Sequence, residues 1–201
     1  MIDQSILLKH YAGESAFGPI SETIEQLFHG LSAIKTGSEF NSKASLACFK
    51  EKNFRDCRKV AAHLYEQAGS PPFDQSTIFI YCCAKGDIRA IDKLARGKQD
   101  PSGVSPLLDD QARLVCQSLG INPCRILVIS NACASGAIGL ETAVQLLQDH
   151  SCTTVVLFGL DCGSEFVLSG FSSLGALSPS QARPFDLHRD GLSLGEGAAF
   201  A

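Results

Sequence analysis

The segment from residue 125 to residue 160 restricts the fold more than any other part of the chain. Arg125–Ser130 (RILVIS) and Thr153–Leu160 (TTVVLFGL) are short apolar runs rich in β-branched residues, and Cys133–Gln148 between them is long enough for a helix. This pattern predicts two strands joined by a helix. Strands connected in this way lie parallel in one sheet, with a right-handed crossover. The segment therefore predicts an α/β protein with a parallel sheet.

The helix expected over Cys133–Gln148 carries a single charged residue, Glu141. A helix that is apolar nearly all round is usually buried inside a protein. Gly136 and Gly139 would let neighbouring elements approach this helix closely. We therefore expect a layered α/β fold, in which the sheet is mostly parallel and this helix is buried between layers.

Hydrophobic spacing and capping signals predict the remaining elements. A short strand is expected over residues 5–8 and a buried strand over Thr77–Cys83. Helices are expected over Ser21–Gly30 (with Ile24, Leu27 and Phe28 on one face), Phe54–Ala68, Asp87–Arg96 and Leu107–Leu119. Residues 35–53 are polar and are expected to be irregular. The Gly- and Ser-rich region from Ser164 ends in an apolar strand with no charged tail, which predicts a fragment of a larger protein.

Composition excludes several classes of protein. Hydrophobic residues make up 45% of the 201 residues, enough for one substantial domain, and the net charge is −4. An acidic balance argues against a nucleic-acid partner, since nucleic-acid binders carry a basic excess. The first 15 residues lack the features of a signal peptide, and the longest uncharged stretch, Ile126–Leu140, is too short to span a membrane. We expect a cytoplasmic protein that does not contact membranes.

The nine cysteines predict neither a disulfide scaffold nor a metal site. Their number is odd, no two form a C-x-x-C pair, and the adjacent Cys82 and Cys83 would point to opposite faces of a strand. Disulfide scaffolds are small and have even numbers of cysteines, and zinc sites need closely spaced ligands. Most of these thiols are expected to be small core hydrophobes in a reducing compartment, and no metal or cofactor is expected.

Cys133 differs from the other thiols in its position. It lies where a strand meets the start of a helix, within Asn131–Gly136 (NACASG). The unpaired N–H groups and the dipole at a helix N-terminus favour a thiolate, which is the nucleophilic form. The same N–H groups can hold an oxyanion, so the position suits acyl transfer. From this context alone, one more core cysteine is an equally good interpretation.

The family resemblance decides between these two interpretations. From Ile126 onward the chain resembles the β-ketoacyl synthases (3-oxoacyl-acyl-carrier-protein synthases) of the thiolase superfamily, whose active-site stretch is matched by Asn131–Gly136. Five later motifs follow in the family's order: Gly159-Leu160-Asp161, Gly170-Phe171 with Leu174–Ser178, Arg183–Asp186, Arg189–Gly191 and Gly195–Ala198. Leu160 replaces a glycine and Leu192 replaces a phenylalanine. A weaker similarity covers Gly18–Ile20 and Gly30–Ile34. The resemblance implies that residues 1–201 form the N-terminal domain of such a synthase, without the C-terminal domain.

The resemblance also implies a reaction and partners. Cys133 would take an acyl group from an acyl-carrier-protein or CoA thioester, and a malonyl thioester would then decarboxylate and attack the acyl-cysteine. In the family two histidines of the C-terminal half drive that second stage. None of the five histidines of this chain lies in those motifs, so we expect this chain not to complete the condensation. The resemblance further implies a homodimer or a partner synthase subunit, with Thr153–Phe158 pairing across the interface.

Arg55, Arg58 and Lys59 form the core of a basic cluster before and within the second expected helix. Carrier proteins are acidic, so a cationic patch would steer them. A second set of cations, Lys85, Arg89, Lys93 and Arg96, has helical spacing. An ordinary solvated helix face is the favoured interpretation of both sets.

The motifs of kinases and hydrolases match this sequence less well than those of the β-ketoacyl synthases. His188-Arg189-Asp190 matches a kinase catalytic triplet, but no Asn follows at the required spacing and no Gly-rich phosphate loop occurs. A hydrolase elbow requires glycines at the positions occupied by Asn131 and Ser135. Two alternatives remain open: a non-catalytic dimerisation or carrier-docking partner of a complete synthase, and another acyltransferase of the thiolase superfamily.

Overall fold

The computed structural model describes residues 6–36, 45–49, 56–98, 105 and 107–201. Its helices are α1 (Ile20–Phe28), α2 (Cys57–Gln67), α3 (Ile88–Ala95), α4 (Leu108–Ser118), α5 (Ser135–Gln148) and α6 (Glu165–Ser173), with a 3₁₀ turn, η3 (Ala132–Ala134). Its strands are β1 (Ala12–Ser15), β2 (Gly18–Pro19), β3 (Lys35–Thr36), β4 (Ser45–Ala47), β5 (Thr77–Cys82), β6 (Arg125–Ile129), β7 (Thr154–Asp161), β8 (Leu194–Gly195) and β9 (Gly197–Phe200).

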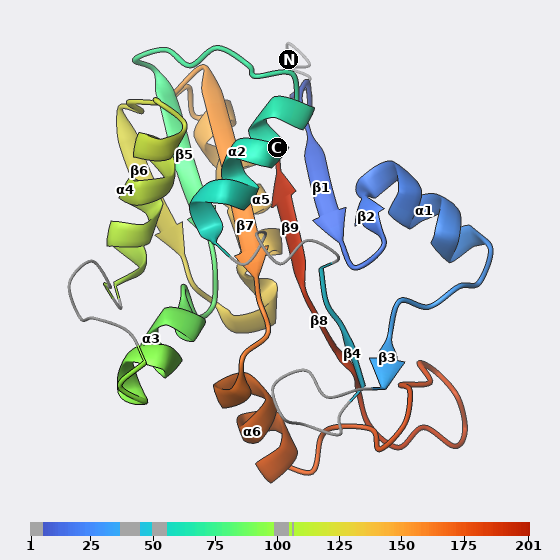
Figure 1. The fold of residues 1–201 in the computed structure, drawn as a ribbon. Coiled ribbons are helices and arrows are strands. Elements are labelled where there is room, and N and C mark those ends of the chain that lie inside the picture. The colour runs from blue at the N-terminus through green and yellow to red at the C-terminus, as the bar shows by residue number, and fades with distance from the viewer. Residues whose placement is uncertain (1–5, 37–44, 50–55, 99–104, 106) are drawn as a thin grey trace.

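Six of these strands form one sheet in the order β2-β1-β9-β7-β5-β6 (Figure 1). β5 lies between β6 and β7 and is parallel to both, so the predicted βαβ unit is confirmed. On the other side of β7 the sheet continues through β9, β1 and β2, whose pairings are antiparallel. The sheet is therefore parallel at its centre and antiparallel towards one edge. A small second sheet has the order β3-β4-β8.

Helices cover both faces of this sheet, which makes three layers (Figure 1). The side chains of β5 are all buried and alternate between the two faces, as in any strand. Phe79 and Tyr81 join the cluster formed with α2 and α4. Ile78 and Ile80 join a separate cluster with Ala143 of α5. The layered α/β fold expected from the sequence is thus confirmed.

α5 is buried on one side only in this chain, whereas its composition predicts a helix buried all round. Ser135, Gly139 and Ala143, spaced four residues apart, are the buried positions. Leu140, on a different side of the helix, is 56% exposed. The difference arises because, within the described residues, α5 packs against the sheet and no other helix covers its outer face.

Three further expectations need correction. Residues 6–8 form no strand, and Leu7 and Leu8 are exposed. The first described strand is β1, because Ala12–Ser15 form backbone pairs with β9. Within residues 35–53, expected to be irregular, β3 and β4 form short strands, while residues 37–44 and 50–53 lie outside the described part. The Gly- and Ser-rich region contains the unpredicted helix α6, whose N-terminus is capped by Ser164.

The topology also bears on the interface expected from the family resemblance. β7 is hydrogen-bonded to β5 along one edge and to β9 along the other. The pairing with β9 covers Phe158–Asp161, and Leu157 bonds to Ala201, so the pairing of Thr153–Phe158 across a dimer stays a prediction. Among the described strands of this sheet, β6 is the one at the parallel edge, with β5 as its single neighbour (Figure 1).

Candidate functional site

Cys133 lies in the turn that connects β6 with α5. β6 ends at Ile129, η3 follows after two residues, and α5 begins directly after η3. The turn leaves the sheet at the carboxyl end of a parallel strand, which is where open α/β sheets bind ligands. The Cys133 residue is exposed, so its sulfur can meet a substrate.

Hydrogen bonds hold the backbone of this turn in an uncommon conformation. Ala132 has a φ of 45°, in the left-handed region that residues with a Cβ rarely adopt. The Asn131 N–H donates to Ser135 Oγ at 2.8 Å, and Ser135 Oγ donates to the Ala132 carbonyl at 2.8 Å. The Ala134 N–H donates to the Asn131 carbonyl at 2.9 Å. These three hydrogen bonds therefore fix the backbone on both sides of Cys133.

The first turn of α5 is open to a bound anion. Its N-cap is Ala134, and no side chain forms a capping hydrogen bond there. The first N–H groups of a helix have no partner within the helix, and together with the helix dipole they attract negative charge. Cys133 lies in η3, one residue before this N-cap, whereas the sequence predicts a helix that begins at Cys133 itself.

The other thiols differ from Cys133 in their surroundings. Of the nine cysteines, only Cys124 and Cys133 are exposed. Burial, followed by the nearby Asp56 and Asp87 carboxylates, raises the pKa of Cys57 to about 12. Burial likewise raises the pKa of Cys82 and of Cys116 to about 11. These thiols are protonated at neutral pH and are poor nucleophiles, as expected for core residues.

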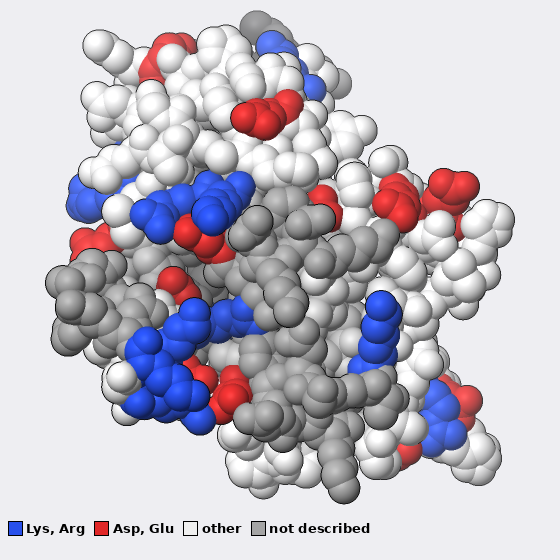
Figure 2. All heavy atoms as spheres, viewed as in Figure 1, with Lys and Arg blue, Asp and Glu red and all other residues white. Residues whose placement is uncertain are grey.

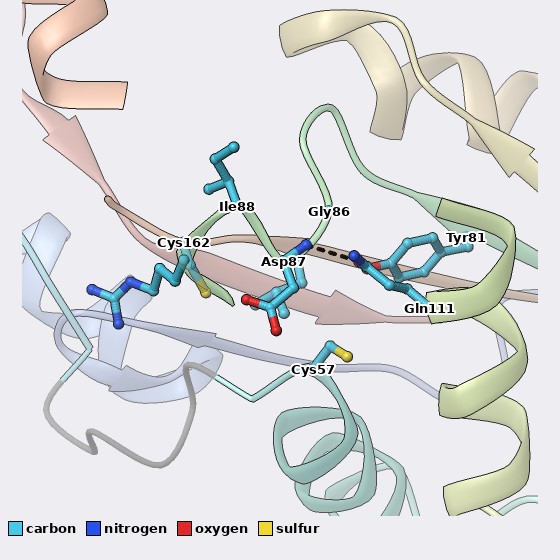
Figure 3. Close-up of a pocket in the computed structure, with 9 residues that line it drawn as sticks. Cys57, Tyr81, Gly86, Asp87, Ile88, Gln111 and Cys162 are labelled. Carbon is cyan, nitrogen blue, oxygen red and sulfur yellow. Dashed lines mark hydrogen bonds between the residues drawn. The ribbon is translucent and has the colours of Figure 1, made fainter. Parts of the chain in front are cut away.

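A small cavity lies on the α2 and α4 face of the sheet (Figure 3). Its volume is about 10 Å³, room for about one water molecule. Gln111 closes one side, accepting hydrogen bonds from the Asp87 N–H at 2.9 Å and the Tyr81 hydroxyl at 3.3 Å. Cys133 does not line this cavity, which is too small for an acyl chain.

A buried carboxylate joins four segments beside this cavity. Glu196 Oε2 accepts from the Phe49 N–H at 2.9 Å, and Oε1 accepts from the Gly163 N–H at 3.0 Å. Arg89 Nη2 of α3 lies 3.3 Å from Glu196 Oε1, and Arg89 Nε donates to the Gly163 carbonyl. The sequence pattern does not reveal this network, because its members are far apart in the chain.

Cations gather over α2 and over α3 on one face of the molecule (Figure 2). Arg58 and Lys59 of the first predicted set are exposed, while Arg55 lies outside the described residues. Arg58 is paired with Asp56 at 3.0 Å. Although partial burial raises the pKa of Asp56, its hydrogen bonds from Arg58 outweigh this and lower it.

Most of the second predicted set is neutralised within the chain. Lys85 is paired with Asp161, Arg89 with Glu196, and Arg96 with Asp92 and Glu165. A cation held by a neighbouring carboxylate contributes little to a positive surface potential. Pairing lowers the positive potential of the first set as well, because Arg58 is held by Asp56 in the same way.

Two classes of site find no support in the described part of the chain. Its His, Cys, Asp and Glu side chains include no group of three that could bind a metal ion. Its helices include none that is both long and apolar enough to cross a membrane.

Comparisons with known proteins identify the fold and the family. Residues 55–201 match the family described as "Beta-ketoacyl synthase, N-terminal domain". A β-ketoacyl synthase from Burkholderia phymatum STM815 has 21% sequence identity and a TM-score of 0.77, with 96% of this chain and 57% of that chain covered. The ketosynthase ApeO in complex with its chain length factor ApeC, from Xenorhabdus doucetiae, has 17% sequence identity and a TM-score of 0.77. The match covers 98% of this chain and 57% of that chain.

A third similar structure is the ketosynthase from module 6 of the bacillaene synthase of Bacillus subtilis 168. It has 16% identity and a TM-score of 0.74, with 96% of this chain and 39% of that chain covered. The chain therefore spans between 39% and 57% of the length of these three structures. Together with the thiolase-like layers and the turn before α5, the match over residues 55–201 shows that this chain belongs to the β-ketoacyl synthase family.

Proposed function

We propose that Cys133 is the nucleophile of an acyl-transfer reaction, the first half of a decarboxylative condensation in fatty-acid or polyketide synthesis. The observation that carries the proposal is its position, exposed and one residue before the N-cap of a helix that no side chain caps. The thiolate attacks the carbonyl carbon of an acyl thioester, and the bond from that carbon to the donor sulfur breaks. The products are acyl-Cys133 and the donor thiol, which takes up the proton.

The open N–H groups at the start of α5 support this chemistry. The tetrahedral intermediate carries a negative oxygen, and fixed N–H donors stabilise such an oxygen without having to reorient. Acyl transfer needs a thiolate and these donors. Decarboxylation needs further donors, which the family takes from two histidines that have no counterpart among residues 1–201. We therefore expect this chain alone to accept acyl groups and not to form carbon–carbon bonds.

We further propose an acyl carrier protein or CoA as the acyl donor. The exposed Arg58 and Lys59, with Arg55 before them in sequence, support an acidic carrier that docks beside α2. Such surface charges raise the association rate more than the affinity, so the effect of removing them is expected to be salt-dependent. CoA would not require this surface.

The extent of the domain and its partner are also part of the proposal. We assign residues 1–54 to the same domain as 55–201, since β1 lies in the same sheet as β9. The single-sided edge of β6 supports association with a second copy or a partner synthase subunit. The odd number of cysteines, nine, with no C-x-x-C pair, supports a reducing, cytoplasmic location.

A second candidate function is a non-catalytic partner subunit. It is favoured by the structural similarity to a ketosynthase in complex with its chain length factor and to the ishigamide ketosynthase/chain length factor. A subunit of that kind would need the fold and the interface but no reactive thiol. The exposed Cys133 at an open helix N-terminus favours the catalytic function.

The decisive experiment is acylation of the purified chain by acetyl-CoA, octanoyl-CoA and octanoyl-acyl-carrier protein, followed by intact-protein and peptide mass spectrometry. We expect the acyl mass on Cys133, its loss in Cys133→Ala, and its retention in Cys124→Ala, the matched variant of the other exposed thiol. Labelled malonyl-CoA tests the second stage, and we expect no CO₂ release above background. An unmodified Cys133 would favour the partner-subunit function.

A further inference from the structure

Ser135 links the two residues that precede Cys133 in the turn. Its side-chain oxygen accepts the Asn131 N–H at 2.8 Å and donates to the Ala132 carbonyl at 2.8 Å. Ser135 is 5% exposed and is the first residue of α5, so the helix holds it in place. A hydroxyl has one donor and two acceptor positions, and this one uses both functions on the turn.

The bonded segment includes the strained residue of the turn. Ala132 has a φ of 45°, which is unfavourable for an alanine and persists only where surrounding contacts enforce it. The Ser135 hydroxyl fixes the carbonyl of Ala132 and the N–H of the residue before it. Without these bonds the peptide groups around Ala132 are free to relax towards negative φ. The direction in which Cys133 leaves the backbone would then change.

We infer that Ser135 is a positioning residue that holds Cys133 in the orientation required for acyl transfer, an inference that rests on the proposed function of Cys133. Ser135 acts through the backbone of the turn and does not itself touch the substrate. Acyl transfer requires the sulfur and the N–H groups of α5 to meet one carbonyl group together. A displacement of about 1 Å can lower the rate of such a reaction about 100-fold.

The surroundings of the turn separate positioning from folding. Asn131 and Ala132 are exposed, so water can replace the two lost hydrogen bonds in Ser135→Ala. The variant should therefore fold, while the turn becomes mobile. Alkylation by a small reagent needs only an accessible thiolate, and it should respond much less than acylation.

The experiment compares Ser135→Ala with Ser135→Thr, which keeps a hydroxyl, and with Ser118→Ala. Ser118 is the matched control, since its Oγ donates to the Val115 carbonyl at 2.8 Å in α4, away from the turn. Three quantities are measured for each: the rate of Cys133 acylation by octanoyl-CoA, the rate of Cys133 alkylation by iodoacetamide, and hydrogen exchange of the Asn131 amide.

For Ser135→Ala we expect acylation to fall about 10- to 100-fold, alkylation to change less than about threefold, and Asn131 exchange to accelerate more than about tenfold. Ser135→Thr should restore acylation to within about threefold, and Ser118→Ala should match the unmodified chain. Equal acylation rates for the unmodified chain and Ser135→Ala would overturn the inference and leave the proposed function intact. A parallel loss of acylation and alkylation would overturn it in favour of a general structural role.

Failure of the proposed function gives a different result, because the unmodified chain itself would then not be acylated on Cys133. Hydrogen exchange still tests the bonds made by Ser135 in that case. Unchanged exchange of the Asn131 amide in Ser135→Ala would show that the hydroxyl does not hold the turn, and would overturn the inference on its own.

Discussion

Arg89 and Glu196 form an ion pair that is almost entirely removed from solvent. Arg89 Nη2 lies 3.3 Å from Glu196 Oε1, and the two side chains are 14% and 1% exposed. Arg89 Nε also donates to the Gly163 carbonyl, and Glu196 Oε1 accepts from the Gly163 N–H; Gly163 lies between β7 and α6. Because Glu196 follows β8 and also binds Phe49, the pair connects α3, the start of α6 and the small sheet.

Removing one partner of this pair should destabilise the fold strongly. Replacing Glu196 with Gln, or Arg89 with Met, leaves a buried group without its opposite charge, which typically costs about 3–5 kcal/mol. We expect a decrease of this order in the free energy of unfolding, measured by urea denaturation. Arg96→Met is the control: Arg96 is 46% exposed in its pair with Asp92, and such pairs contribute at most about 1 kcal/mol. Equal effects of Arg89→Met and Arg96→Met would contradict this prediction.

Gly139 should not tolerate a side chain, because α5 approaches the sheet most closely there. A Cβ on Gly139 would lie 2.3 Å from the Cys82 sulfur. Gly139→Ala should therefore lower the free energy of unfolding by about 1–3 kcal/mol, and Cys82→Ala should partly restore it. Gly136→Ala is the control in the same helix: it has no neighbour within 4 Å of the added Cβ and should stabilise by up to about 1 kcal/mol. Thermal unfolding of these variants checks the prediction, and equal effects at the two glycines would refute it.

Cys133 should be the first thiol to be alkylated. Brief treatment of the folded chain with iodoacetamide at pH 7–9, with peptide mapping, should label Cys133 before Cys124, which is exposed but does not precede a helix. The pKa of Cys57, about 12, and that of Cys116, about 11, lie above this range, so these thiols stay protonated and labelling remains slow as the pH rises. Cys133→Ser should abolish the fast phase. Faster labelling of Cys124 or Cys57 would disprove the assignment.

β6 should become protected from hydrogen exchange as the protein concentration rises. Its outer edge has no partner strand among the described residues, so its outward N–H groups exchange in a monomer and are bonded when a second chain pairs with it. β5 is the internal control, since Ile78–Cys82 pair with a strand on each side and their protection should not depend on concentration. Exchange of β6 that is independent of concentration, together with a monomer mass in sedimentation, would contradict association through this edge.

The sequence predicts the centre of the fold well for a physical reason. β5, β6 and β7 are apolar runs in the sequence, and β5 pairs with each of the other two. An apolar run of this kind directly indicates a buried strand. α6 escapes prediction because Ser and Gly dilute its apolar pattern, although Ser164 caps it and Leu168 is buried. Periodicity detects α1 correctly but does not show what its apolar face meets: Phe28 is 87% exposed.

The candidate site was only partly predictable. A cysteine at the junction of strand and helix can be recognised from local sequence, and the structure places Cys133 there. The hydrogen bonds of Ser135 depend on the left-handed conformation of Ala132, which no periodic pattern reports. The serine two positions after the cysteine is the one signal that could have indicated them. The pairing of Arg89 with Glu196 depends on tertiary structure alone.

The place of β9 in the sheet sets the order in which the molecule can be completed during synthesis. β9 lies between β1 and β7, so the first and last strands of the described chain are direct neighbours. Contacts between such distant segments form slowly, because a long loop must close first. While the chain leaves the ribosome, β5, β6 and β7 can assemble with their helices, but β1 pairs with the two-residue strand β2 alone among the described strands until residues 197–200 emerge. We therefore expect the central strands to fold first, and β1 to join the sheet only together with β9.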